Sequence, residues 1–242
     1  MPDRYADVEA LIRREPAPDD GEQSASDGMR RLCSAAGRAL SASGVGMAVM
    51  ADGGLRGMTA ASDPATERLE ELQLTLGEGP CIDAYASRRP VLVPDLSGGA
   101  MTRWPAYAPA AHAKGVRAVF AFPLQVGAAR LGMLDVFRTA PGMLSPDELA
   151  LALSFAEVAV STLLDGHRDN PGETDDGPGD PLGSRAELFQ AQGMVMVQLK
   201  VTLAEAMVRM RAHAYANDRR LAHIAADIIA RRLRFDPDPQ QP

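Results

Sequence analysis

A segment rich in glycine, proline and aspartate divides this chain of 242 residues into two parts. The segment covers residues 166–183 and contains almost no apolar side chains. The segment is also acidic. Because it has almost no side chains to bury, its composition is typical of a flexible linker. The residues on either side must therefore build separate cores, and we expect a larger domain followed by a smaller one.

The two parts differ in charge. Nine Lys and Arg residues and four Asp and Glu residues lie between Ser184 and Phe235, whereas the chain as a whole has a net charge of −7. This change of sign favours a separate module with a polyanionic partner. A solvated basic surface is the simpler alternative, because cations near a helix C-terminus are favourable for dipole reasons alone.

The larger part combines helix and strand patterns. The spacing predicts helices at 29–40, 66–74 and 145–164, and strands at 45–50, 55–62, 91–93, 116–124 and 130–138. The last helix starts at a capping box formed by Ser145 and Glu148. Antiparallel hairpins between helices indicate an α+β fold, and we expect an antiparallel sheet with helices on one face. Residues 1–26 are expected to be a polar leader with a single helical turn near Val8.

The smaller part has the pattern of three short helices, at 185–199, 203–216 and 219–234. Capping-box spacing begins the first helix at Ser184 and the second at Thr202. Asn217 or Asp218 is expected to cap the third helix. A core this small provides little stability by itself, and docking or dimerisation would add to it. We therefore expect a homodimer.

Two arginines mark the start of the predicted third helix. Arg219 and Arg220 would lie in its first turn, at the positive end of the helix dipole. A bound phosphate would contact both guanidinium groups and the free amide groups of that turn. This position favours polyanion binding over a merely solvated basic face.

The smaller part contains the run from Gln190 to Met196, followed by Ala206, Arg211, Ala214, the run Asp218 to Leu221, and Ala225. This pattern resembles the ANTAR family, whose three-helix domains bind hairpins in nascent transcripts and prevent transcription termination. The resemblance implies an all-α domain over 184–236 with RNA as its partner. It also implies the RNA-binding residues Ala191, Gln192, Gly193, Arg211, Arg219 and Arg220.

Two positions depart from that family pattern. Gln192 stands where the family usually has lysine, and Asp218 stands where it usually has asparagine. Both changes remove positive character from the expected RNA surface and would reduce the salt dependence of binding. They favour the alternative that the three helices bind protein rather than RNA. Phe189 could stack on a base or form an apolar contact with such a partner.

Four motifs of the larger part form a second pattern. They are the run from Leu76 to Ala84, Val93 to Leu96, Trp104 to Tyr107 and Gly115 to Ala118. Together they resemble the GAF domains that precede ANTAR domains in actinobacterial regulators, over residues 27–165. The resemblance implies a GAF-type antiparallel sheet with flanking helices and a ligand site between sheet and helices. The implied sensing residues are Cys81, Trp104 and Tyr107, for a small-molecule or redox signal.

Each of these sensing residues also has a purely structural interpretation. Cys81 follows a tight loop at a helix start, where a thiol would have a lowered pKa and could react with oxidants. It could instead be a small residue packed under that loop. Trp104 and Tyr107 could line a ligand site or fill the core. The signal and any cofactor are not specified by the sequence.

The sequence contains no recognised catalytic or metal-binding motif. Asp83 and Asp135 are isolated acids, and no paired carboxylates, Ser/His/Asp set or zinc-type cluster stands out. We therefore expect no enzyme and no metal site. No apolar run approaches the roughly 20 residues that span a bilayer, and no signal segment begins the chain. The prediction is a cytoplasmic transcription regulator that senses a signal and binds RNA; the alternative is a sensor or dimerisation protein.

Overall fold

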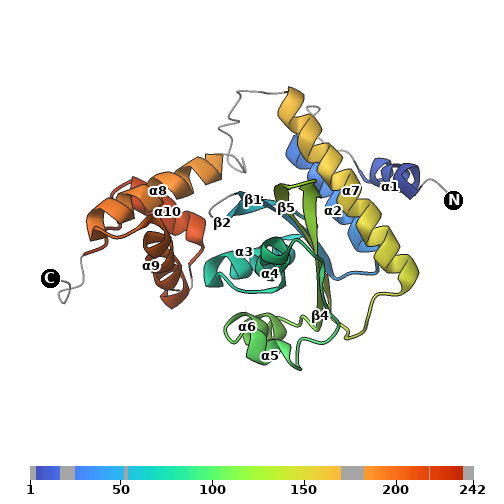
Figure 1. Cartoon of the computed structure of the whole chain (residues 1–242), viewed down its shortest axis with the longest axis horizontal. Coiled ribbons are helices and arrows are strands. Elements are labelled where there is room, and N and C mark those ends of the chain that lie inside the picture. The colour runs from blue at the N-terminus through green and yellow to red at the C-terminus, as the bar shows by residue number, and fades with distance from the viewer. Residues whose placement is uncertain (1–3, 17–24, 52–53, 170–182, 218, 237–242) are drawn as a thin grey trace. The chain divides into compact units, whose positions relative to one another are not determined.

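The computed structural model describes residues 4–16, 25–51, 54–169, 183–217 and 219–236. They form two compact units. The first contains a five-stranded sheet and its helices, and the second contains the helices α8, α9 and α10 (Figure 1). Among the described residues, no helix combines the length and the apolar character that a membrane span requires.

The sheet of the first unit is antiparallel throughout, with the strand order β2-β1-β5-β4-β3. Its strands are β1 (Gly44–Ala51), β2 (Gly54–Ala61), β3 (Val91–Val93), β4 (Ala118–Val126) and β5 (Ala129–Arg138). The predicted hairpins β1–β2 and β4–β5 are confirmed. The pairing of β1 with β5 joins these two hairpins into one sheet.

Seven helices accompany the sheet in the described part of this unit. They are α1 (Arg4–Arg13), α2 (Ala25–Ala39), α3 (Pro64–Leu76), α4 (Pro80–Ser87), α5 (Ala100–Arg103), α6 (Tyr107–Ala113) and α7 (Pro146–Asp169). The expectation of helices on one face was wrong. Helices α2 and α7 cover one face, and α3 and α4 lie on the other (Figure 1). Such double coverage explains the unbroken buried runs Ala118–Phe122 of β4 and Gly132–Phe137 of β5, in which side chains facing either way are buried.

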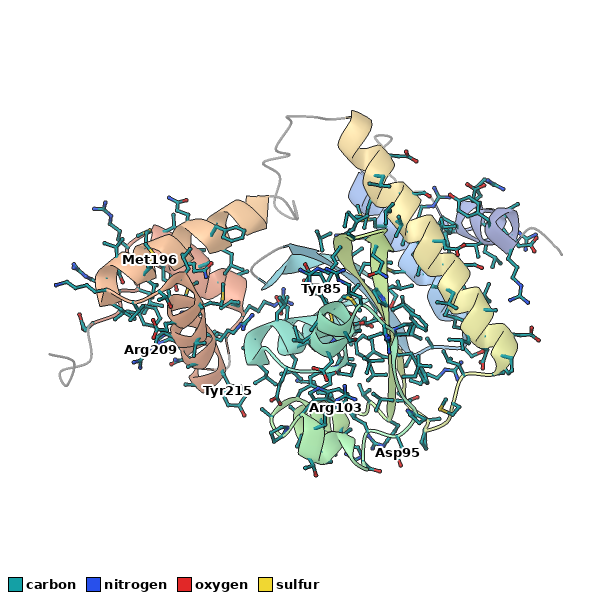
Figure 2. The ribbon with its side chains drawn as sticks, viewed as in Figure 1. Tyr85, Asp95, Arg103, Met196, Arg209 and Tyr215 are labelled. Atoms are coloured by element: carbon teal, nitrogen blue, oxygen red, sulfur yellow. The ribbon has the colours of Figure 1, made fainter. Side chains whose placement is uncertain are left out.

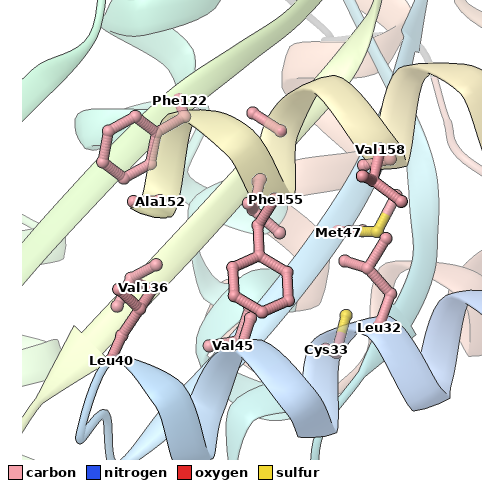
Figure 3. Packing of buried hydrophobic residues seen from close by; sticks show 14 of the residues in the cluster. Leu32, Cys33, Leu40, Val45, Met47, Phe122, Val136, Ala152, Phe155 and Val158 are labelled. Atoms are coloured by element: carbon pink, nitrogen blue, oxygen red, sulfur yellow. The ribbon is translucent and has the colours of Figure 1, made fainter. Parts of the chain in front are cut away.

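The main core lies between the sheet and the helices α2 and α7. Figure 3 shows Phe155 of α7 and Leu32 of α2 among side chains from the strands. Val45, Phe122 and Val136 project from three adjacent strands into this cluster. Alternation along a strand sends every second side chain to one face, so the neighbours of these residues must face α3 and α4.

The N-terminal segment is more ordered than expected. Helix α1 has ten residues instead of one turn, and Val8 is completely buried in the main core. Beyond the helix, the Arg38 Nε donates a hydrogen bond to Glu15 at 2.9 Å. Burial of Val8 and this pairing attach the segment to α2, so its polar composition alone was misleading.

The linker predicted from the sequence begins before the preceding helix has ended. Helix α7 continues to Asp169, four residues into the segment predicted as linker. The capping box at its start is confirmed, because the Glu148 amide donates to the Ser145 hydroxyl and the Ser145 amide donates to the Glu148 carboxylate. Residues 170–182 lie outside the described part of the chain.

The second unit is a three-helix domain made of α8 (Gly183–Leu199), α9 (Leu203–Ala216) and α10 (Leu221–Ile229). Its core is a set of small and aliphatic side chains at helical spacing: Leu188, Ala191, Val195, Leu199, Ala206, Met210, Ala214, Leu221, Ile224, Ala225 and Ile228. The predicted capping box of Thr202 with Glu205 is present. The predicted box at Ser184 falls among side chains that the structure does not describe.

The third helix is shorter than predicted and starts later. Its N-cap is Arg220, which has extended backbone angles, so Arg219 and Arg220 precede the helix instead of forming its first turn. Asn217 ends α9, where its side-chain amide donates to the His213 carbonyl oxygen, and it does not cap α10. Asp218 lies outside the described residues.

We predict that Gly132→Ala destabilises the sheet. A Cβ atom on Gly132 would lie 2.2 Å from the Ala48 carbonyl oxygen on the neighbouring strand. Rigid backbone cannot move aside as a side chain would, so the expected loss is about 2 kcal/mol or more, as in strong overpacking. Thermal unfolding should show a melting temperature lowered by several degrees.

Gly98→Ala is the matched control, because a Cβ atom there has nothing within 4 Å. It should melt with the wild-type chain. Equal melting of wild type and Gly132→Ala would contradict the close approach of β1 and β5.

Candidate functional sites

A cluster of polar side chains lies within the first unit, between the sheet and helices α3 and α4. Glu70 and Gln73 come from α3, Cys81 from α4 and Asp135 from β5. Each of these four residues is 1% exposed or less. Buried acids without cationic partners are rare in proteins, which makes this cluster the leading candidate for a functional site in this unit.

Gln73 connects the cluster. Its side-chain amide donates to the Asp135 carboxylate at 2.8 Å, and its amide oxygen accepts the Cys81 backbone N–H at 2.9 Å. Gln73 therefore holds the start of α4 against β5.

Gly46 makes room for Glu70. Gly46 stands opposite Asp135 in the pairing of β1 with β5, and a Cβ atom on it would collide with the Glu70 carboxyl group. The missing side chain on β1 thus lets Glu70 lie against the sheet beside Asp135. The Glu70 oxygens and Asp135 Oδ1 accept no hydrogen bond from a donor in the described part of the chain.

The environment favours the neutral form of both carboxyl groups. Burial, followed by the negative charge of Asp135, raises the pKa of Glu70 well above its ordinary value. Burial raises the pKa of Asp135 to about 6, against the opposing effect of the hydrogen bond from Gln73. Because Asp135 has this extra donor, we assign the carboxylate to Asp135 and the retained proton to Glu70.

The thiol of Cys81 does not have the lowered pKa that was expected. It is fully buried, and burial together with the charges of Asp135 and Glu70 raises its pKa well above the ordinary value. Pro80 and Cys81 do begin a helix, as the sequence predicts, but burial and the neighbouring acids outweigh the effect of the helix N-terminus. On its own, this thiol is protonated and a weak nucleophile.

The two aromatic candidates, Trp104 and Tyr107, are buried side chains of the same unit. Tyr107 is completely buried, and burial and the charges of Asp135, Glu70 and Cys81 raise its pKa well above the ordinary value. Trp104 is 2% exposed. Neither the Tyr107 hydroxyl nor the Trp104 indole nitrogen has a hydrogen-bond partner among the described residues.

Two acids that flank Cys81 in the sequence hold the segment from Arg103 to Tyr107 in place. Glu78 accepts the backbone N–H groups of Ala106 and Tyr107 at 2.6 and 2.7 Å. Asp83, interpreted as an isolated acid in the sequence, accepts the Arg103 Nε at 2.9 Å. The Arg103 guanidinium group, labelled in Figure 2, also lies 4.7 Å from the centre of the Trp104 ring. These contacts attach the segment that contains Trp104 and Tyr107 to the first half of α4 and to Glu78, which precedes it.

Glu70 and Gln73 were missed in the sequence, and Asp135 was interpreted as isolated. The expectation that no paired carboxylates exist was therefore wrong. One signal was available: Asp135 interrupts the apolar run of β5, and a charge inside a buried strand needs a partner. The partner could not be identified, because Glu70 has the sequence context of an ordinary surface helix.

In the second unit, the predicted RNA-binding residues divide into interior and surface positions. Ala191 is fully buried in the three-helix core. Gln192 is 7% exposed, and its side-chain amide donates to the Leu203 carbonyl oxygen at 2.7 Å. These two residues support the packing of α8 against α9. A Cβ atom on Gly193 would have nothing within 4 Å, so this position is open.

Three charged side chains join the two ends of α10. Asp227 on α10 accepts Arg219 Nη2 at 2.6 Å and Arg232 Nε at 2.7 Å. These bonds, Arg219 first, lower the pKa of Asp227. One carboxylate therefore brings together two guanidinium groups that are 13 positions apart in the sequence, and the set keeps a net positive charge. Arg220 lies beside it as the N-cap of α10, and Arg211 lies on α9.

Large apolar side chains are exposed on the same unit. Phe189 and Val197 on α8 are 44% and 70% exposed, and Val208 and Tyr215 on α9 are 60% and 58% exposed. Arg209 and Tyr215 project from α9 in Figure 2. Aromatic and aliphatic groups beside cations suit either stacked bases or a protein partner.

Comparison with known families assigns both units. The GAF domain model matches residues 22–163, more than half of the chain, and the ANTAR domain model matches residues 181–229. The chain belongs to the GAF family and carries an ANTAR domain behind its GAF domain. Both are domains of regulatory proteins, and ANTAR domains belong to a family of RNA-binding antiterminators.

Solved structures agree with the fold of the GAF domain. The GAF domain of a phosphoenolpyruvate-protein phosphotransferase from Coxiella burnetii has 15% identity and a TM-score of 0.52, and covers 69% of this chain and 94% of that one. The corresponding domain from Acinetobacter has 11% identity and a TM-score of 0.50, and covers 70% and 96%. No curated protein matches the chain significantly. The GAF-type antiparallel sheet with flanking helices and the three-helix ANTAR domain are thus both established.

We predict that Glu70→Gln stabilises the GAF domain at high pH. The folded-state pKa values of Glu70 and Asp135 lie above their ordinary values, reaching about 6 for Asp135. Their contribution to stability is therefore fully present below about pH 4 and declines as the pH rises through the folded-state values. Glutamine keeps a donor toward Asp135 and removes one titrating group.

Denaturant unfolding in EDTA-containing buffer should show the variant more stable than wild type by about 1 kcal/mol or more at pH 8, since one pKa unit is worth 1.36 kcal/mol. The difference should be small at pH 5. Equal slopes of stability against pH in the two proteins would contradict the pairing of Glu70 with Asp135.

Proposed function

We propose that this GAF and ANTAR domain-containing protein is a transcription antitermination regulator. The GAF domain senses a small-molecule or redox signal. The ANTAR domain binds hairpins in nascent transcripts and prevents termination. The observation that carries the proposal is the basic group at the ends of α10, which lies in a domain of the ANTAR family.

The charges of this group suit a phosphate backbone. Arg219 and Arg232 are held by Asp227, and each keeps part of its guanidinium group exposed, with 39% and 65% of the side chains accessible. Pre-positioned arginines lose less freedom on binding and can form bidentate contacts with phosphate. No side chain caps the N-terminus of α10 behind Arg220, so its amide groups add to the positive potential.

Because Gln192 and Ala191 are buried, we leave them out of the RNA surface that the family resemblance implies. Because Gln192 is engaged with the backbone of α9, the absence of lysine at this position does not remove a cation from the surface that we propose for RNA. The proposed RNA surface consists of Gly193, Arg211, Arg219 and Arg220, extended by Arg232.

A protein-binding role for the same helices is the second candidate. The exposed Phe189 and Val197 on α8 favour it. Association through such side chains would be insensitive to salt, whereas phosphate binding weakens steeply as salt increases. Light scattering and RNA binding measured over a range of salt concentrations separate the two candidates, and would also establish whether the protein is a homodimer.

We predict that Arg219→Ala combined with Arg220→Ala weakens binding of the full chain to hairpin RNA by about tenfold or more, because two phosphate contacts are lost. Filter binding against a pool of hairpins, with duplex DNA as competitor, measures the effect. The slope of affinity against salt concentration should also become shallower.

Arg68→Ala combined with Lys114→Ala is the control, since it removes two exposed cations from the GAF domain and changes the net charge equally. Affinity should remain at the wild-type level. The RNA site proposed around α10 fails if the two double variants bind alike, and RNA binding as a whole fails if the wild-type chain shows no preference for hairpin RNA.

A further inference from the structure

The buried cluster of the GAF domain has the donor atoms of a metal site. The Cys81 sulfur and one oxygen each from Glu70 and Asp135 lie within 4.8 Å of one another. Ligands of a tetrahedral zinc ion, with bonds of about 2.0–2.3 Å, are separated by about 3.5 Å. Small side-chain rotations would therefore bring the three donors to bonding distance around one ion.

We propose that Glu70, Cys81 and Asp135 bind a divalent first-row transition-metal ion, of which Zn²⁺ and Fe²⁺ are the ordinary cellular examples. A thiolate ligand disfavours Mg²⁺ and Ca²⁺, which require oxygen donors, and suits the softer transition ions. Two carboxylates and one thiolate supply enough negative charge to bind a divalent ion. With three protein ligands, a coordination position stays open for a signal molecule.

The unsatisfied groups around the cluster support an ion at this place. Both Glu70 oxygens are buried and accept no hydrogen bond from a donor among the described residues, and the polar neighbour of this carboxyl group is the second acid, Asp135. Two carboxyl groups buried together need a shared proton or a cation between them. Tyr107 is completely buried as well, and its hydroxyl has no hydrogen-bond partner among the described residues. A bound ion would satisfy the carboxylates.

Residues around the three donors would hold them in place. Gln73 donates to Asp135 and accepts the backbone N–H of Cys81, so it fixes two ligands at once. Gly46 leaves the space that Glu70 occupies. Outer contacts of this kind orient the ligands of known metal sites.

This inference rests on the proposed function in one respect, because it gives the signal-sensing GAF domain a ligand class. The competing explanation is a proton shared between Glu70 and Asp135 with no metal. The two explanations differ in whether the Cys81 thiol ever becomes a thiolate, which cobalt can report.

The test uses the full chain refolded from denaturant with Co²⁺, because a site this deeply buried would load slowly in the folded protein. A thiolate-to-cobalt charge-transfer band with one ion per chain is expected, and Zn²⁺ but not Mg²⁺ should displace it. The absence of the band after refolding with Co²⁺ would overturn the proposal.

Variants of the two buried cysteines assign the band. Cys81→Ala should abolish it, whereas Cys33→Ala should keep it, because Cys33 lies on α2 in the core on the other face of the sheet. Glu70→Gln should weaken cobalt binding by about tenfold or more, and near-ultraviolet circular dichroism checks that it is folded. A band that survives Cys81→Ala would also overturn the site.

The experiment separates failure of this proposal from failure of the proposed function. Hairpin RNA binding by the same refolded sample depends on the ANTAR domain. A cobalt band without RNA binding would overturn the RNA-binding function and support the metal site. RNA binding without the band would overturn the metal site and support the RNA-binding function.

Discussion

The alternation of side chains along β5 is the constraint on which the GAF domain depends. This strand pairs with β1 on one side and β4 on the other, so it joins the two hairpins. Leu134 and Val136 point into the core under α2 and α7, while Asp135 between them points toward α3 and α4. A slip of one residue would place the carboxylate in the apolar core and two aliphatic side chains among acids. The same register therefore defines both the stable core and the candidate site.

The sequence was informative where local rules decide the structure. Capping boxes at Ser145 and Thr202, the two hairpins and the three-helix pattern all depend on residues that are close in the chain, and each is present. Family resemblance supplied the rest of the architecture. The coverage of both sheet faces was missed because α4, which packs on the second face, has only eight residues and is too short to show periodicity.

The candidate sites were harder to predict, because they depend on contacts between distant residues. Glu70 meets Asp135 only through the register of β1 with β5 and the missing side chain of Gly46. Arg219 was expected inside a helix, but the extended backbone of Arg220 starts α10 later, and Asp227 then holds Arg219 next to Arg232. Cys81 was placed correctly at a helix start. Its burial, together with acidic neighbours that come from other elements, reverses the expected shift of its pKa.

The positions of the two cysteines have a practical consequence. Cys33 and Cys81 are both fully buried, on helices that cover opposite faces of the sheet. The sheet between them prevents an internal disulfide, and neither thiol is accessible to a maleimide or spin-label reagent in the folded protein. Cysteines introduced on the surface of the wild-type chain, one on each domain, can therefore be labelled selectively. Distance measurements between labelled GAF and ANTAR domains then become feasible without first removing the native thiols.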